Sequence, residues 1–232
     1  MVSKKILKRS ETHITGFDDL ICGGFPLGST VLLNGNPGSG KTIFSLQYLV
    51  NGAIFNKEKG IYFSFEEKRE SLVLQASQFG WDLDDLEKKG LIKIISFGTS
   101  FLDKYSSEEI IEIINSFKAN RVVIDSITTL SFLVNAQDGV LSEYEVNRYL
   151  YGFITKFKTL VGVNFLLISQ KGGLGSNAAE FICDGLLNIE TESLGGSYSR
   201  NLTIKKMRST KNDDNLHPLE ISENGIKLHS FM

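Results

Sequence analysis

The stretch GNPGSGKT at residues 35–42 decides the fold class. It matches the pattern G-x-x-x-x-G-K-[ST], and it stands between the apolar run TVLLN and the helical pattern TIFSLQYLV. A phosphate-binding loop requires this strand–loop–helix context. Glycines let the chain wrap with its N–H groups inward, and the start of the helix adds a partial positive charge for anionic oxygens. The sequence therefore predicts a nucleoside triphosphate site.

The residues of this loop have distinct expected roles. The Lys41 ammonium reaches the β- and γ-phosphates of ATP, and the Thr42 hydroxyl binds Mg²⁺. The expected nucleotide contacts extend over Gly35, Asn36, Pro37, Gly38, Ser39, Gly40, Lys41, Thr42 and Ile43. ATP and Mg²⁺ are thus the expected ligands.

Apolar runs alternate with helical patterns along most of the chain. The predicted strands are 30–35, 60–65, 91–96, 121–127, 163–169 and 185–190. The predicted helices are 41–55, 71–79, 107–117 and 141–160. Continuous apolar strands favour a sheet covered on both faces, and strand–helix alternation favours parallel order. After about residue 185 strands and turns follow one another. We therefore expect an α/β domain with a mainly parallel twisted sheet, flanked by helices, and antiparallel C-terminal strands.

Composition and charge exclude several classes of protein. The chain has 232 residues, 41% hydrophobic and 22% charged, which is typical of a globular domain. A net charge of −2 gives no overall basic field for nucleic acid. Cys22, Cys183 and the three histidines lack metal-ligand spacing. No apolar run approaches the roughly 18 residues of a membrane span, and no signal-peptide core is present. We expect a cytoplasmic protein without a membrane partner.

A basic cluster stands at the start of the chain. It contains Lys4, Lys5, Lys8 and Arg9. We interpret residues 1–11 as a solvated tail and residues 12–232 as a single domain.

Acidic residues follow two of the predicted strands. Glu66 and Glu67 come after the run at 60–65, and Asp125 ends the run at 121–125. Functional groups of open α/β sheets gather at the carboxyl ends of strands. Asp125 suits Mg²⁺ coordination through water, and a glutamate on a strand beside the phosphate loop suits activation of the attacking water. Taken alone, EEKRE is typical of a charged helix start. Together the acids favour hydrolysis; which glutamate is the base stays open, and Glu67 is also a candidate metal ligand.

Gln170 ends a further apolar strand. Its amide suits a sensor of the γ-phosphate that acts on the glycine-rich loop after it, KGGLG. The alternative is an ordinary polar strand end. A loop in this place could contact a polymer or a protein partner.

Several segments, in the same order, resemble one family. They are residues 13–42, the double glutamate, VVIDSIT at 122–128, KKMRST at 205–210 and HPLEISENGI at 217–226. Together they resemble the KaiC family of RecA-type ATPases over about residues 12–228. The resemblance implies a RecA-like P-loop core and a homo-oligomeric ring, commonly a hexamer, with ATP between subunits. It also suggests an archaeal-type, single-domain protein with an unidentified protein partner.

The resemblance gives a role to the C-terminal basic residues. Lys206, Met207 and Arg208 stand where the family has a K-x-R pair that reaches the γ-phosphate of the neighbouring subunit. Residues two apart on a strand face the same way, so Lys206 and Arg208 point together. Without the family, a basic edge strand that discourages aggregation is the simpler interpretation. The resemblance also implies that Thr210 and Glu223 touch the neighbour's nucleotide.

Four functions stay open. The leading one is a ring-forming ATPase whose nucleotide state controls a partner. Autokinase activity is disfavoured, because Glu180 and Phe181 stand where the family's kinase domain has serine and threonine. A role in DNA recombination, as in RadA paralogues, shares the fold, yet only Lys171 in the glycine-rich loop supports nucleic acid. A slow or non-hydrolysing ATP-dependent switch is the fourth.

Overall fold

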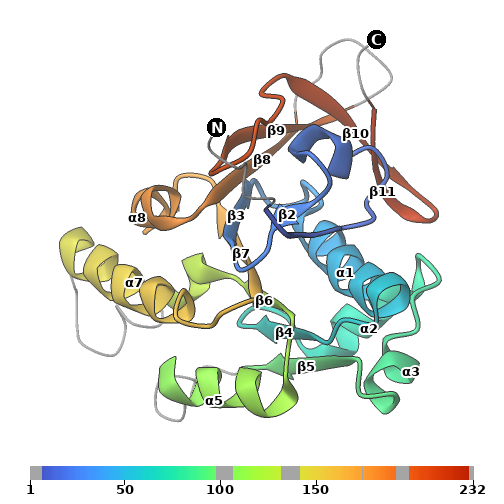
Figure 1. The fold of residues 1–232 in the computed structure, drawn as a ribbon, viewed down its shortest axis with the longest axis horizontal. Coiled ribbons are helices and arrows are strands. Elements are labelled where there is room, and N and C mark those ends of the chain that lie inside the picture. Colours follow the sequence, from blue (N-terminus) through green and yellow to red (C-terminus); the bar gives the residue numbers. More distant parts are fainter. Residues whose placement is uncertain (1–6, 98–106, 132–141, 174, 192–198, 230–232) are drawn as a thin grey trace, which may run out of the picture.

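A nine-stranded sheet forms the centre of the computed structural model, which describes residues 7–97, 107–131, 142–173, 175–191 and 199–229 (Figure 1). The order of its strands is β11-β10-β9-β8-β3-β7-β6-β4-β5. The strands are β3 (Thr30–Gly35), β4 (Gly60–Ser64), β5 (Ile92–Ser96), β6 (Arg121–Asp125), β7 (Asn164–Gln170), β8 (Gly185–Thr191), β9 (Arg200–Met207), β10 (Leu216–Ser222) and β11 (Gly225–Leu228).

The sheet has the expected mixture of strand directions. All neighbours from β8 through β3 to β5 are parallel, whereas β8, β9, β10 and β11 pair antiparallel in succession. Every residue of β3, β4 and β6 is buried, because helices cover both faces of this part of the sheet. The α/β class and the antiparallel C-terminal strands are therefore confirmed.

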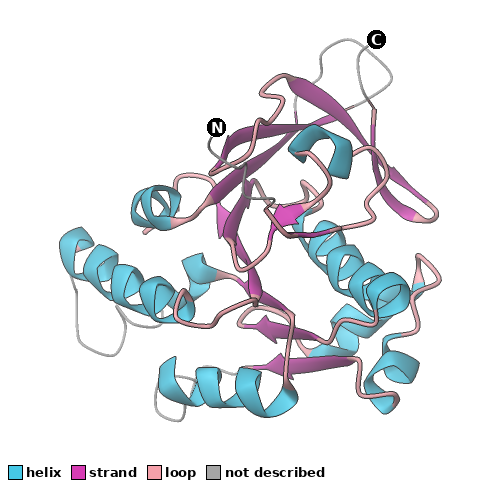
Figure 2. Cartoon of the chain, in the orientation of Figure 1, coloured by secondary structure: helices cyan, strands magenta, loops and turns pink. Residues whose placement is uncertain are grey.

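Helices form a layer on each face of the sheet (Figures 1 and 2). One layer contains α1 (Lys41–Asn51), α2 (Arg69–Ser77) and α3 (Leu83–Lys88), and the other contains α5 (Ser107–Phe117), α7 (Glu143–Phe157) and α8 (Ser176–Ile182). Helix α7 begins at a capping box formed by Ser142 and Glu145, which satisfies orphan N–H groups of its first turn. None of the helices described is long and apolar enough to cross a bilayer.

The last residues of the predicted tail belong to the fold. Arg9–Ser10 form β1, which pairs with β2 (Phe25–Pro26). The Arg9 guanidinium donates to the carbonyls of Ile21 and Gly24 and to Thr210 Oγ1. The interpretation of residues 1–11 as a solvated tail is therefore wrong from Arg9 onward, because buried carbonyls bind this cation. Lys4 and Lys5 lie outside the described residues.

A buried arginine joins the N-terminal segment to the sheet. Arg121, at the start of β6, is 1% exposed. Its guanidinium donates to Glu58 Oε2 at 2.5 Å, to the Tyr48 carbonyl at 2.8 Å and to the Glu11 carbonyl at 2.6 Å. It also lies over the Tyr48 ring, 4.5 Å from the centroid. The helical path of α1 continues past this cation as a wider turn (Gly52–Asn56), where a Cβ on Gly52 would meet the guanidinium at 2.4 Å.

Replacing Arg121 by alanine should cost roughly 3–5 kcal/mol of unfolding free energy, because it empties a buried position and leaves the partly buried Glu58 carboxylate and two carbonyls without their donor. Chemical denaturation monitored by circular dichroism measures this. The matched control is Arg69→Ala, which removes a half-exposed ion pair with Asp84 and Glu87 and should cost about 1 kcal/mol or less. Equal losses in the two variants would contradict the assignment of Arg121 as a structural anchor.

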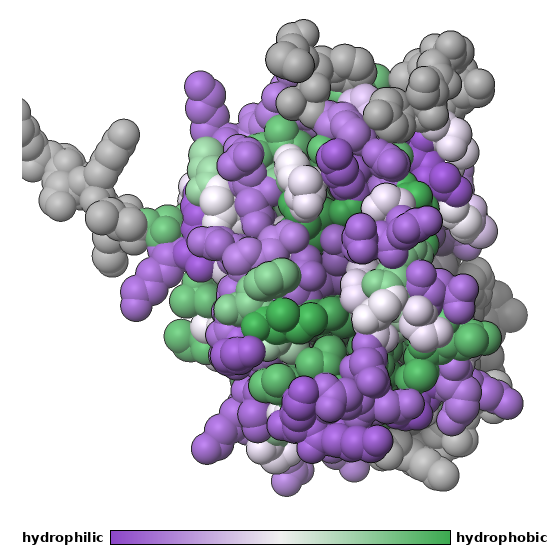
Figure 3. Space-filling model, turned by 90° about the vertical axis from the view of Figure 1, so that its right-hand side faces the viewer, coloured by the Kyte–Doolittle hydropathy of each residue, from purple (hydrophilic) through white to green (hydrophobic). Residues whose placement is uncertain are grey.

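Figure 3 shows the side of the molecule that lies opposite α7 and α8. Apolar side chains form a band across it, with hydrophilic residues above and below. Exposed apolar residues of α2 and of the turn that continues α1 include Leu74, Ile54 and Phe55, of which Phe55 is 62% exposed.

Candidate nucleotide-binding site

The phosphate loop curls around Lys41 between β3 and α1. Gly38 and Gly40 have φ of 77° and 106°, backbone conformations that glycine adopts without strain. A Cβ on Gly35 would lie 2.5 Å from Ser39 Oγ and 2.7 Å from the Ile189 carbonyl, so the close approach of loop and strand also needs glycine. Lys41 Nζ donates to the carbonyls of Gly35 at 2.8 Å and Asn36 at 3.0 Å.

A cavity of about 230 Å³ opens beside this loop. Its lining brings together residues that the sequence analysis selected from four different segments. They are Pro37, Gly38, Lys41, Thr42, Glu66, Glu67, Asp125 and Gln170, together with Ser126 and Ile168. The register explains the grouping, because Gly35 pairs with Gln170, and Ser64 pairs with Asp125, at the carboxyl edge of the parallel strands.

One expectation about this grouping was wrong. The strand before the two glutamates, β4, does not lie beside the phosphate-loop strand β3, because β7 and β6 stand between them. The carboxylates still line the same cavity, since all four strands end at the same edge of the sheet.

Asp125 is held from inside the sheet. It is 5% exposed, and the fully buried Tyr62 hydroxyl donates to its Oδ2 at 2.5 Å. Burial raises the pKa of Asp125 to about 6, although the Tyr62 hydrogen bond acts in the opposite direction. Burial also lowers the pKa of Lys41, against the attraction of Asp125 and Glu66. The three charged groups are therefore close enough to influence one another. The sequence pattern does not indicate this contact, because Tyr62 is one of several large apolar residues in the predicted strand at 60–65.

The adjacent glutamates have different surroundings. Glu66 Oε1 accepts hydrogen bonds from Ser126 Oγ and Thr129 Oγ1, both at 2.5 Å. Its carboxylate thus lies beside the residue that follows Asp125. Glu67 Oε2 instead accepts from Ser71 Oγ at 2.6 Å and Gln75 Nε2 at 2.5 Å, both on α2. Glu66 is directed toward the end of β6, and Glu67 toward α2.

The donor set fits a magnesium–nucleotide complex. No group of three or more His, Cys, Asp or Glu side chains in the described part of the chain could hold a metal by itself. Mg²⁺ commonly uses one or two protein ligands, with waters and phosphate oxygens completing its shell. Thr42 and Asp125, which line one cavity, supply such a set. Glu67 as a further ligand stays a prediction, because its Oε2 already binds α2.

A second cavity of about 310 Å³ adjoins the first and shares Gly38, Lys41 and Thr42 with it. Its remaining lining is Gly40, Ile43, Gln75, Arg200 and Ile221. The sequence analysis missed Arg200, Gln75 and Ile221. Arg200 Nη2 donates to the Gly38 carbonyl at 3.4 Å, and its buried Nε has no hydrogen-bond partner among the described residues. No motif marks Arg200; only the pairing of β8 with β9 brings it to this edge.

Lys206 and Arg208 lie away from this edge. Met207 pairs with Gly185, and Gly185 pairs with Val31, four residues before Gly35. Along a strand this is roughly 13 Å. Lys206 Nζ donates to the Glu180 carbonyl at 2.7 Å, and Arg208 donates to the Phe181 carbonyl and to Asp184 Oδ1. Both cations therefore point to the end of α8, as expected for residues two apart. Met207 is 4% exposed, which leaves its backbone for the predicted nucleotide contact.

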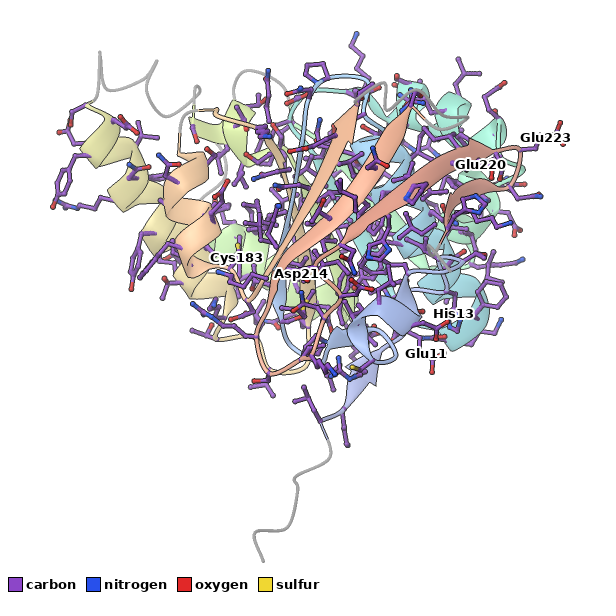
Figure 4. The ribbon with its side chains drawn as sticks, turned by 90° about the horizontal axis from the view of Figure 1, so that it is seen from above. Glu11, His13, Cys183, Asp214, Glu220 and Glu223 are labelled. Carbon is purple, nitrogen blue, oxygen red and sulfur yellow. The ribbon has the colours of Figure 1, made fainter. Side chains whose placement is uncertain are left out.

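Thr210 and Glu223 lie at different ends of the C-terminal strands, and their contact with the neighbour's nucleotide stays a prediction. Thr210 follows β9 and accepts a hydrogen bond from Arg9. Glu223 is in the turn between β10 and β11, two residues after Ile221 of the second cavity. Figure 4 shows it at the tip of this hairpin, far from Cys183 at the end of α8. Glu223 thus lies on the side of its own phosphate loop, because β10 runs in the same direction as β3.

The sequence that forms this site matches the model of a known protein family over nearly all of its length. Residues 10–231 match the model of the family described as "ATPase: KaiC". The chain belongs to the KaiC ATPase family. The resemblance drawn from the motifs is thereby confirmed, and nucleotide binding is a property that the family implies for the phosphate loop.

Relatives of this KaiC-family chain come from bacteria and archaea. A UPF0273 protein of Thermotoga maritima is 32% identical over 97% of this chain and 97% of its own length. The circadian clock oscillator protein KaiC of Synechococcus elongatus is 30% identical over 96% of this chain, which spans 44% of that protein. The crystal structure of a KaiC-like protein from Pyrococcus horikoshii superimposes with a TM-score of 0.81 at 30% identity, over 97% of this chain and 100% of that one.

Proposed function

We propose that this KaiC-family protein is an Mg²⁺-dependent ATPase that forms a homo-oligomeric ring, most simply a hexamer, and that its nucleotide state controls a protein partner. The observation that carries the proposal is the cavity shared by Lys41, Thr42, Asp125, Glu66 and Gln170. Hydrolysis of a phosphoanhydride needs a lysine that binds the phosphates, a hydroxyl and a buried carboxylate for the metal, and an exposed carboxylate for the attacking water.

Each residue has a separate task in this proposal. Lys41 leaves the loop carbonyls that it binds in this structure and neutralises phosphate oxygens, and Thr42 and Asp125 hold the magnesium-bound nucleotide. When bound, Mg²⁺ supplies charge neutralisation to the β- and γ-phosphates. Glu66 orients a water and accepts its proton, and Gln170 senses the γ-phosphate. In this proposal Arg200, which lines the second cavity, contacts the nucleotide of its own subunit. A contact of Glu223 with the neighbour's nucleotide stays a prediction.

The position of Lys206 and Arg208 supports the ring. The two cations lie at the end of α8, and neither is among the described residues that line the two cavities beside the phosphate loop. A second subunit would present its acidic, nucleotide-filled edge to these cations. The expected assembly is checked by light scattering with and without Mg²⁺ and a non-hydrolysable ATP analogue. A monomer under both conditions would contradict the ring.

Lys41→Ala should weaken ATP binding by about 10- to 100-fold. A hydrogen bond to a charged group contributes about 1.5–3 kcal/mol, and this variant removes one from the phosphates. Titration with a fluorescent ATP analogue measures the change, and Lys57→Ala, at the far end of the helical segment, is the control. ATP binding as tight as in the wild type would refute the phosphate-loop assignment.

A further inference from the structure

Helix α8 lies between the phosphate-loop strand and the basic pair. It begins at Ser176, a few residues after Gln170 of the first cavity, and it ends at Ile182. In Figure 1, α8 lies beside β8 and β9 on the same face of the sheet as α7. The helix therefore spans the distance from the nucleotide edge to the basic pair.

Carbonyls at the end of α8 accept hydrogen bonds from three cationic side chains. The carbonyl of Glu180 accepts from Lys206, the carbonyl of Phe181 accepts from Arg208, and the carbonyl of Ile182 accepts from Lys158. Carbonyls at a helix C-terminus have no partner within the helix, and their partial negative charge attracts cations. The direction of Lys206 and Arg208 is thus set by where α8 ends.

Glu180 connects the same helix to the phosphate-loop strand. Its Oε1 accepts a hydrogen bond of 2.8 Å from Asn34 Nδ2. Asn34 is the last residue before Gly35, it is 1% exposed, and its Oδ1 is buried with no hydrogen-bond partner among the described residues. Glu180 itself is partly exposed, but the Asn34 amide is buried, so loss of this hydrogen bond would leave a buried donor without its acceptor. The contact therefore favours one position of the Glu180 carboxylate. One residue thus binds Asn34 through its side chain and Lys206 through its carbonyl.

We propose that Glu180 is a positioning residue that holds α8, and through α8 the Lys206/Arg208 pair, in register with the phosphate-loop strand of the same subunit. The inference rests on the proposed function, in which the pair completes the site of the neighbouring subunit. Its consequence is that a subunit's phosphate-loop strand sets how well that subunit assists its neighbour. A misplacement of about 1 Å at a reacting centre can cost 10²-fold in rate.

Mixed rings of two inactive variants separate this role from a general one. The donor subunit carries Glu66→Gln and Glu67→Gln, so it binds ATP without turnover and keeps its basic pair. The receptor subunit carries Arg208→Ala, so it keeps its carboxylates and lacks the arginine of the pair. Turnover then arises where a donor's pair faces a receptor's site. The measurement is phosphate release from the mixture, with ring size checked by light scattering.

Glu180→Ala is then placed in one subunit at a time. In the donor it should lower turnover of the mixed rings by about 10- to 100-fold. In the receptor it should change little, because the pair of the receptor is already incomplete. Glu180→Gln in the donor should retain most of the turnover, since its amide oxygen can accept from Asn34 Nδ2. Asn34→Ala in the donor removes the other end of the contact and should reproduce the loss, which covers the case in which Glu180→Ala does not assemble.

Two results would overturn the inference while leaving the proposed function intact. One is undiminished turnover with Glu180→Ala in the donor; the other is an equal loss with the substitution in either subunit, which indicates a general structural role. If the donor and receptor do not restore turnover even with Glu180 intact in both, the action of the pair in trans is itself refuted, and the inference falls with it.

Discussion

Replacing Glu66 and Glu67 together by glutamine is expected to lower ATP turnover by about 10²–10⁴-fold while leaving ATP binding intact. Removal of a general base costs about this much, because the attacking water loses its proton acceptor in the transition state. Glutamine keeps the size of the side chain and can still accept hydrogen bonds from Ser126 and Ser71. Phosphate release and nucleotide titration, carried out on the same preparation, measure turnover and binding.

The two single substitutions should differ. Glu66 lies beside Asp125 and Ser126, whereas Glu67 is held by Ser71 and Gln75 on α2. We therefore expect Glu66→Gln to carry most of the loss and Glu67→Gln the smaller part. A larger loss from Glu67→Gln would reverse the assignment of the base. Unchanged turnover in the double variant would contradict carboxylate catalysis and favour a switch that binds ATP without using these residues.

The elements of the core were predictable from local sequence patterns. The runs at 30–35 and 185–190 differ from β3 and β8 by at most one residue, because a mostly apolar run that starts or ends at glycine gives a clear strand signal. The helix predicted at 107–117 has the bounds of α5, since its isoleucines repeat at helical spacing. The phosphate loop was predictable because its glycines and lysine satisfy local geometric requirements.

The parts that were missed depend on pairing between distant segments. Arg200 reaches the second cavity only because β9 runs antiparallel to β8, and Glu223 reaches the same edge only because β10 reverses once more. Tyr62 supports Asp125 because β4 pairs with β6, and nothing in GIYFS distinguishes its hydroxyl from one that faces solvent. The burial of Arg121 is likewise set by partners from three segments, Glu11, Tyr48 and Glu58. Sequence spacing carries no information about such contacts.

Arg208→Ala should lower turnover by about 10³–10⁵-fold with little change in ATP affinity. A cation supplied by a neighbouring subunit stabilises charge that develops in the transition state, and such an arginine contributes about this much to the rate. Folding should be unaffected, because Arg208 is half-exposed and its ion pair with Asp184 contributes about 0–1 kcal/mol.

The control for Arg208 is Lys205→Ala on the same strand. It removes the same charge from an exposed side chain of the same strand, so its turnover should match that of the wild type. Steady-state kinetics of both variants, at ring concentrations verified by light scattering, give the comparison. Equal turnover in Arg208→Ala and Lys205→Ala would show that Arg208 does not act at a neighbour's phosphates. A loss of ATP affinity in Arg208→Ala as large as its loss of turnover would show uniform binding of the nucleotide instead, since an interaction made only in the transition state leaves ground-state affinity unchanged.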